Sequence, residues 1–152
     1  MSSKKDSLIE YQRKRHFTRT PEPTGHPEVI DTNSSRFVVH EHHATRLHHD
    51  FRLEMDGALK SWAIPKFVPT EPRIRRLAIQ TEDHPLDYID FQGVIPEGEY
   101  GAGKVEIWDR GIFDMESRQE RKLVIRLKGR RLDGRYALIQ TRERQWIILK
   151  SK

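Results

Sequence analysis

The sequence predicts an all-β protein, an antiparallel sandwich or barrel of about eight short strands with a short N-terminal helix and arm. From residue 36 onward, short runs rich in apolar and β-branched residues are separated by Gly, Asp and Pro turn signals. The strongest of these signals is Asp56-Gly57, because this dipeptide favours the two-residue turn of a hairpin. A chain of 152 residues is long enough for one domain with a single core.

The first 35 residues differ from the rest, because they are polar and are broken by prolines and a glycine. Within them, Ser7–Arg15 is predicted to form a short helix with Leu8 and Tyr11 on one side, three residues apart. The remainder of this part is predicted to be an extended arm that docks on the main body. The expected division is therefore an arm, 1–35, and a β core, 36–152.

The turn at Asp56-Gly57 also predicts a register for the hairpin around it. A two-residue turn sets Phe51 opposite Trp62 and Asp50 opposite Ala63. The aromatic pair would then lie on the buried face. The small neighbour of Asp50 would leave open space on the polar face.

Turn signals and glycines divide the rest of the core. Glu82–Pro85 is predicted to be an acidic corner, and Asp109–Gly111 and Asp133–Gly134 are predicted turns. The glycine-rich stretch Gly93–Gly103 lacks the Gly-Lys-Ser/Thr ending of a Walker phosphate loop, so we interpret it as a structural loop with Tyr100 as a plug. The predicted strands are Phe37–His40, Leu47–Met55, Ala58–Ile64, Arg76–Thr81, Lys104–Trp108, Ile112–Met115, Lys122–Leu127, Arg135–Gln140 and Gln145–Lys150.

The composition is strongly ionic, with 35% hydrophobic and 34% charged residues. A net charge of +5 favours a polyanionic partner such as nucleic acid, although 28 basic residues are interleaved with 23 acidic ones. The absence of cysteine excludes disulfides and thiolate metal sites. No apolar run approaches the roughly 20 residues of a transmembrane helix, and the N-terminus lacks the apolar segment of a signal peptide. We therefore expect a soluble, cytoplasmic protein with no membrane partner.

Residues 42–52 gather five metal-capable side chains and two arginines into eleven positions. As a strand of period 2, their second half presents His48, Asp50 and Arg52 on one face. Two imidazoles and a carboxylate with open coordination positions suit Mn²⁺, Zn²⁺ or Fe²⁺. The candidate metal ligands are therefore His42, His48 and Asp50, with His42 returning from the preceding loop.

The other histidines of this stretch leave the choice of ligands open. His40, His43 and His49 compete for the same role, although His49 shares the strand face of Phe51 and is better suited to packing. The alternative to a metal site is a polar strand with scattered surface histidines. The clustering of imidazoles beside a carboxylate favours the metal.

Two arginines could bind a phosphate beside such a metal. The guanidinium of Arg52 can hold two phosphate oxygens in a fork, and an ion pair with Glu54 or Glu82 is the alternative. Arg76 could supply a second clamp, or could belong with its neighbouring arginines to a solvated basic edge.

His84 is a candidate proton donor. It stands in the predicted corner beside Glu82, and a nearby carboxylate favours the charged imidazole, which can protonate a leaving oxygen. A histidine before a proline is otherwise an ordinary turn residue. Tyr88 lies four residues further on and could bind substrate or pack.

Long strings in the chain resemble a known family. The similarity extends from residue 11 to residue 150, nearly the whole chain, and the family is the 3′-phosphoesterase domain of bacterial DNA ligase D. The strings that carry it are Phe37-Val38-Val39, Arg46–Glu54, Asp56–Lys66, Glu82–Tyr88, Phe91–Gly98, Tyr100–Gly103 and Trp108–Gly111, together with His42.

The resemblance implies a β-barrel core and a Mn²⁺-dependent activity on the 3′ ends of primer-template nucleic acids, with Zn²⁺ or Co²⁺ as alternative cofactors. It implies removal of a 3′-terminal ribonucleoside and hydrolysis of the resulting 3′-phosphate to a 3′-hydroxyl, in DNA repair by non-homologous end joining. A DNA ligase partner would be a separate protein.

The family motifs also imply roles for individual residues. The arm, 1–35, would complete the active site of the 36–152 core. His16 stands where the family usually has Asp, and His40 where it usually has Gln. The implied metal ligands are His42, His48 and Asp50; the implied catalytic residues are His84, Arg52, Arg76, Tyr88 and Glu82; the implied phosphate and substrate contacts are Arg15, Glu22, Arg52, Arg76, His84 and His40.

A different class of function is the main alternative. A non-catalytic module that binds nucleic-acid ends and recruits a separate ligase would fit the same composition. Such a binder does not require a metal triad together with Arg52 and His84, and this constellation favours an enzyme. A purely structural metal would leave the arginines unexplained.

Overall fold

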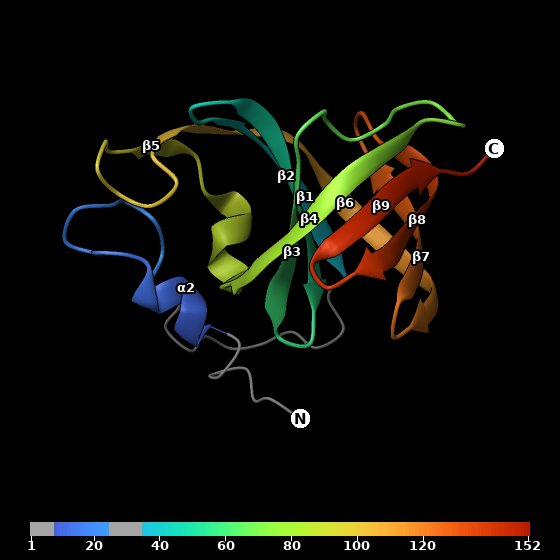
Figure 1. Ribbon diagram of the computed structural model, residues 1–152, viewed down its shortest axis with the longest axis horizontal. Coiled ribbons are helices and arrows are strands. Elements are labelled where there is room, and N and C mark those ends of the chain that lie inside the picture. The colour runs from blue at the N-terminus through green and yellow to red at the C-terminus, as the bar shows by residue number, and fades with distance from the viewer. Residues whose placement is uncertain (1–7, 25–34) are drawn as a thin grey trace.

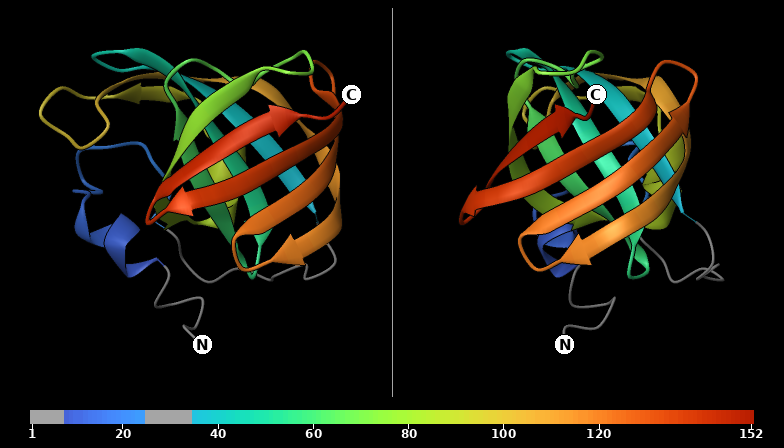
Figure 2. Two further views of the ribbon diagram at one scale, coloured as in Figure 1. Left: turned by 45° about the vertical axis from the view of Figure 1, so that its right-hand side comes forward. Right: turned by 90° about the vertical axis from the view of Figure 1, so that its right-hand side faces the viewer.

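A computed structural model of the chain describes residues 8–24 and 35–152. The all-β prediction is confirmed: within these residues, nine antiparallel strands form one sheet in the order β1-β2-β3-β4-β9-β8-β7-β6-β5. Pairing of β1 with β6 closes eight of them into a barrel, and β5 lies outside it beside the start of β6 (Figure 1, Figure 2). The elements are α2 (Ile9–Arg13), β1 (Arg36–His43), β2 (Leu47–Met55), β3 (Ala58–Ile64), β4 (Arg75–His84), η1 (Leu86–Asp90), β5 (Gly93–Ile95), β6 (Gly103–Gln119), β7 (Lys122–Gly129), β8 (Asp133–Arg142) and β9 (Gln145–Lys150).

The hairpin of β2 and β3 has the predicted register. Phe51 pairs with Trp62 and Asp50 pairs with Ala63, and the two aromatic ring centroids lie 6.3 Å apart. Both residues of the Asp56-Gly57 turn have positive φ, 54° and 80°. A type I′ turn requires this backbone, and its twist matches that of the strands.

The predicted turn at Asp109–Gly111 is wrong, because β6 runs through it without a break. Gly111 lies where β6 approaches β7 closely, and a Cβ at this position would lie 2.1 Å from the carbonyl oxygen of Lys128. This glycine therefore serves a strand contact and not a turn.

Several predicted strands are longer in the structure than the sequence indicated. The Glu82–Pro85 corner is wrong, since β4 continues to His84 and ends at the proline, which has no N–H for a further ladder bond. The predicted Asp133–Gly134 turn forms the start of β8, β1 extends to His43, and the first residues of the glycine-rich loop form β5.

The two faces of the barrel wall carry different apolar clusters. Phe37, Val39 and Phe51 point inward into the main core, which also contains the tryptophans Trp62 and Trp146. The residues between them on the same strands point outward. There they meet the second cluster, which covers one side of the barrel: Tyr11, Val38, Leu59, Tyr88, Ile89, Phe91, Ile95 and Val105.

The outer cluster exists because α2, η1 and β5 gather on one side of the barrel, away from β7, β8 and β9 (Figure 1). Tyr11 of α2 is fully buried there, and its hydroxyl donates to the carbonyl of Pro23. This bond ties the two ends of the 8–24 segment together, and the burial of Tyr11 holds them against the wall. No helix among the described residues is long and apolar enough to span a membrane.

Asp109 fixes the turn between β7 and β8. Its carboxylate accepts backbone N–H bonds from Arg130, Arg131 and Leu132 at 2.9, 3.1 and 2.8 Å, and the residue is only 4% exposed. An anionic acceptor satisfies three donors that the turn would otherwise leave without a backbone partner.

Asp109→Asn should therefore lower the free energy of unfolding by about 3 kcal/mol. The amide replaces one acceptor oxygen by an NH₂ group, which would then face the backbone N–H groups of the turn. Urea denaturation followed by tryptophan fluorescence measures this change. The matched control is Asp114→Asn, whose half-exposed carboxylate pairs with Lys128 and should change stability by less than about 1 kcal/mol. Equal midpoints for the two variants would contradict the role of Asp109.

Candidate active site

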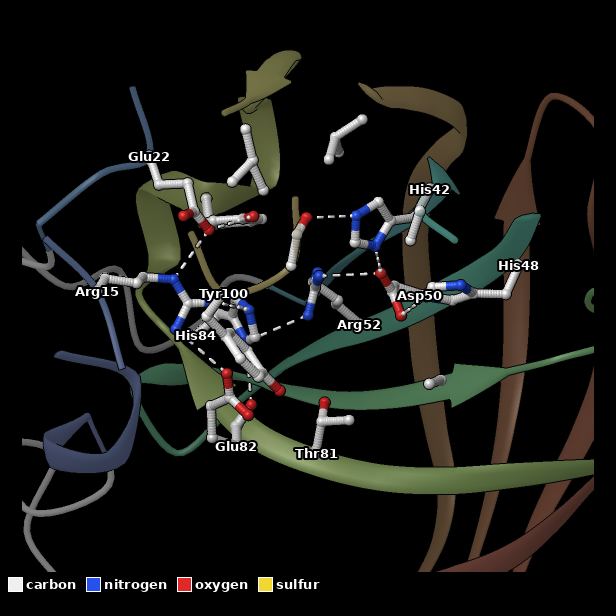
Figure 3. Close-up of a pocket in the computed structure, with 16 residues that line it drawn as sticks. Arg15, Glu22, His42, His48, Asp50, Arg52, Thr81, Glu82, His84 and Tyr100 are labelled. Carbon is white, nitrogen blue, oxygen red and sulfur yellow. Dashed lines mark hydrogen bonds and ion pairs between the residues drawn. The ribbon is translucent and has the colours of Figure 1, made fainter. Parts of the chain in front are cut away.

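A pocket of about 250 Å³ opens on the outer face of the barrel. Most of one wall comes from β1, β2 and β4, with single residues from β3 and β6, and the other comes from the 8–24 segment, η1, β5 and the 96–102 loop. Figure 3 shows Arg15 and Glu22 at one end, His42, His48 and Asp50 at the other, and Arg52 and His84 between them.

The predicted metal ligands lie together. His42 is in β1 and not in a loop as predicted, and it stands directly opposite His48 of β2 in the strand register. The Nδ1 of His42 lies 3.2 Å from one carboxylate oxygen of Asp50, and the Nε2 of His48 lies 3.1 Å from the other. One ligand atom from each residue falls within 4.8 Å of the others.

Each of the two imidazoles is also held by a backbone carbonyl. The Nε2–H of His42 donates to Gly101 at 2.7 Å, and the Nδ1–H of His48 donates to Arg46 at 3.0 Å. In a neutral ring the other nitrogen is then a lone pair, and both lone pairs face the same carboxylate. That arrangement requires a cation or added protons between the groups, and this donor set with open positions fits a divalent metal.

The groups around Asp50 favour its ionised form. Burial alone would raise its pKa, but the hydrogen bonds that His42 and His48 make to it when a proton lies between the groups, and the charge of Arg52, hold the pKa well below its usual value. Burial likewise acts to lower the pKa of His48, and the bond to Asp50 outweighs it and raises the pKa. The carboxylate is therefore ionised and available as a ligand.

Arg52 crosses the middle of the pocket. Its Nη2 lies 3.6 Å from the Asp50 carboxylate, its Nη1 lies 3.2 Å from Nδ1 of His84, and its guanidinium carbon is 5.0 Å from the Tyr88 ring centroid. These contacts fix the orientation of the Arg52 guanidinium. A guanidinium held this way beside a candidate metal site suits a phosphate oxygen.

His40 lies behind Arg52 and is not among the residues that line the pocket. Its Nδ1 accepts from Arg52 Nε at 3.2 Å, and its Nε2–H donates to the Phe91 carbonyl at 3.0 Å. Burial and the neighbouring guanidinium lower the pKa of His40 to about 3, so the ring is a neutral acceptor. His40 therefore contacts Arg52 and not the pocket. Glu54, which was one predicted ion-pair partner of Arg52, pairs with Arg36 instead.

His84 is surrounded by cations, contrary to the prediction of a charged imidazole beside a carboxylate. Its Nδ1–H donates to the Glu82 carbonyl at 2.9 Å, and its Nε2 accepts from Arg15 Nη2 at 3.3 Å. Burial, then Arg52 and Arg15, lower its pKa well below the usual value. The free ring is therefore neutral, with a lone pair at Nε2.

The 8–24 segment supplies charge to the other end of the pocket. Arg15 Nε lies 2.9 Å from Glu22, and Arg15 Nη1 lies 3.2 Å from Glu82. Tyr88 donates its hydroxyl to Glu22 at 2.8 Å, and Lys14 pairs with Glu82 at 3.2 Å. These five side chains form one network, in which the two cations Lys14 and Arg15 balance the two carboxylates Glu22 and Glu82.

Arg76 is the one predicted arginine that does not line the pocket. It lies on the same strand face as Ala78, which is buried in the barrel core. The pairing of β4 with β3 shifts register between Leu59 and Ser61, and such a bulge turns the following residues to the other face. Simple alternation would put Arg76 and His84 on one face, and the bulge separates them.

Sequence reasoning missed the contribution of the 96–102 loop. Its Tyr100 and Gly101 line the pocket, and Gly101 has a φ of +77° that favours glycine. The fold of this loop brings them there, and no spacing or periodicity in the chain could have located them. The glycines of this loop indicated only that the backbone turns tightly there, and not that it reaches the pocket.

Comparisons with known proteins identify relatives for nearly the whole chain. Residues 40–140 match the model of the DNA ligase D 3′-phosphoesterase domain. The multifunctional non-homologous end joining protein LigD of Pseudomonas aeruginosa is 49% identical over 95% of this chain. Proteins of the same name from Mycobacterium bovis and Mycolicibacterium smegmatis are 47% and 42% identical over 97% of it. The chain spans 18%, 20% and 21% of the length of these three relatives.

The environment of His84 predicts its protonation state. In ¹⁵N-histidine-labelled protein, long-range ¹H–¹⁵N spectra between pH 6 and 8 should show His84 neutral, with its proton on Nδ1. The unfolded histidine titrates near pH 6.5, so the stability that this neutral ring contributes should be lost as pH falls below about 6.5. His84→Gln assigns the signal, and titration at or above 6.5 would contradict the arrangement.

Proposed function

The chain belongs to the DNA ligase D 3′-phosphoesterase family, and from this we propose that it is a metal-dependent hydrolase that heals nucleic-acid 3′ ends. In this proposal it removes a 3′-terminal ribonucleoside, then hydrolyses the remaining 3′-phosphate to a 3′-hydroxyl, during non-homologous end joining. The observation that carries the proposal is the pocket shared by the His42–His48–Asp50 group and two guanidiniums.

His42, His48 and Asp50 would hold the metal, for which we propose Mn²⁺, with Zn²⁺ or Co²⁺ as alternatives. When bound, such an ion supplies positive charge that stabilises negative charge on a phosphate oxygen. The second nitrogens of both histidines are already engaged by carbonyls. These bonds fix the tautomers that a metal requires.

The arginines would bind the phosphate from two sides. Arg52 stands next to the metal group, and Arg15 stands on the far side of His84. Guanidiniums fixed before substrate arrives cost little reorganisation when charge develops on phosphate oxygens. We therefore assign phosphate binding to Arg52 and Arg15.

His84 would handle the proton of the leaving 3′-oxygen. In the free pocket burial and two cations lower the pKa of His84 and so suppress its charged form. A phosphate between Arg15 and Arg52 would neutralise these cations, so Nε2 could take up a proton and pass it on. Glu22 and Glu82 would position Arg15, with Tyr88 holding Glu22. His40 would position Arg52.

The N-terminal arm, 1–35, would complete the active site of the 36–152 core. Support comes from its described part, in which Arg15 and Glu22 line the pocket. The chain spans about a fifth of its relatives, so a ligase that seals the healed end would act from a separate part or protein. The substrate partner is a primer-template end with a terminal ribonucleotide or 3′-phosphate.

Activity can be tested on a 5′-labelled duplex with a recessed 3′-phosphate, with Mn²⁺ and with EDTA. Phosphate should be lost only with the metal. Asp50→Asn should abolish the reaction, because an amide cannot replace the carboxylate as an anionic ligand. Asp114→Asn, a surface carboxylate outside the pocket, is the matched control and should retain full rate.

The outcomes separate the two functional classes. If the wild-type protein retards the end in a gel but the 3′-phosphate persists with Mn²⁺, Co²⁺ and Zn²⁺, the chain is an end-binding module. If Asp50→Asn retains the full rate, the metal site has been assigned wrongly. Circular dichroism of the variant establishes that any loss is not unfolding.

A further inference from the structure

Tyr100 lines the pocket but takes no part in the proposed phosphate chemistry. The other pocket tyrosine, Tyr88, is 2% exposed and uses its hydroxyl on Glu22. Tyr100 is instead 46% exposed, and its ring lies beside the Arg15 guanidinium in the pocket (Figure 3). A large aromatic ring exposed beside a phosphate site suggests a ligand contact.

Two cations of the 8–24 segment contact the Tyr100 ring. The ammonium of Lys14 lies 4.6 Å from the ring centroid and donates to the hydroxyl at 3.4 Å. The Arg15 guanidinium carbon lies 5.3 Å from the same centroid and 3.9 Å from the ring of Tyr11. Arg15 thus links a buried ring to an exposed one.

The backbone around Tyr100 is also fixed. Two successive turns close the loop, with Glu99 N–H donating to Pro96 at 3.2 Å and Ala102 N–H donating to Glu99 at 3.1 Å. The next residue, Gly101, accepts the 2.7 Å bond from His42. Because hydrogen bonds already hold this loop, the Tyr100 ring would lose little conformational freedom on binding a ligand.

We propose that Tyr100 stacks on the nucleobase of the terminal nucleotide, the one that carries the processed phosphate on its 3′-oxygen. The inference rests on the proposed function, because it takes the phosphate to lie between Arg52 and Arg15. Only a sugar separates that phosphate from its base, and Tyr100 is the exposed ring beside Arg15. Stacking uses the π face that every base has, so the contact should tolerate any sequence.

A binding experiment tests this directly. A duplex that ends in 2-aminopurine 3′-phosphate is titrated with protein in EDTA, so that no turnover is needed. The wild-type protein and Tyr100→Phe should both quench the fluorescence of the terminal base, because both keep the ring. Tyr100→Leu keeps the apolar bulk but not the π face and should not quench. Phe67→Leu, at another exposed aromatic residue outside the pocket lining, is the matched control and should quench like wild type.

A kinetic experiment separates stacking from a merely structural role. With Mn²⁺, Tyr100→Leu should raise KM for a nucleoside 3′-phosphate end by roughly 10- to 100-fold. For an abasic 3′-phosphate end, wild type and variant should have similar KM. An equal loss on both ends, or quenching by Tyr100→Leu, would overturn the stacking role.

The two proposals fail differently. If wild type does not release phosphate from either end, the proposed function is wrong, whatever the fluorescence shows. If wild type is active on both ends but does not quench the terminal base, the proposed function stands and the role of Tyr100 is wrong.

Discussion

Successive side chains of a strand point to opposite faces, and the whole molecule depends on this constraint at β2. Phe51 and Leu53 enter the barrel core, while His48, Asp50 and Arg52 line the pocket on the outer face. One segment therefore builds the scaffold and the site at once. A shift by one residue would exchange the two sets and destroy both. The paired rings of Phe51 and Trp62 anchor the register that keeps Asp50 on the outside.

A pocket on the outer face of a barrel needs walls of its own. The outer apolar cluster supplies them by packing Tyr11 and η1 against the strands. It also removes water from Asp50 and His84, which are 9% and 3% exposed. Charges buried this way are costly unless they are paired. The chain pairs them in two groups, the carboxylate Asp50 with His42, His48 and Arg52, and the cation Arg15 with Glu22 and Glu82.

What could be predicted from sequence follows local rules. Asp56-Gly57 set the hairpin, and the two-residue period of β2 was enough to separate Asp50 and Arg52 from Phe51. What could not be predicted depends on contacts between distant segments. The bulge in β4 directs His84 to the pocket and leaves Arg76 on the core-facing side, and neither the bulge nor the cationic surroundings of His84 can be read from neighbouring residues. Gly111 was predicted to lie in a turn, because a glycine required by a close contact between strands cannot be distinguished in sequence from a glycine required by a turn.

The two ends of the pocket are linked through the same short stretch of backbone. Gly101 fixes the tautomer of His42 at the end of the pocket proposed to bind the metal, while its neighbour Tyr100 contacts Lys14 and Arg15 of the arm. Displacing the arm would free Tyr100 and remove the cations from Glu82, and it would leave Nε2 of His84 without its donor. Displacing the loop would release His42. The proposed metal ligand His42 and the proposed phosphate-binding residue Arg15 therefore both depend on contacts with residues 100 and 101, and the pocket has its full lining only when both segments are docked.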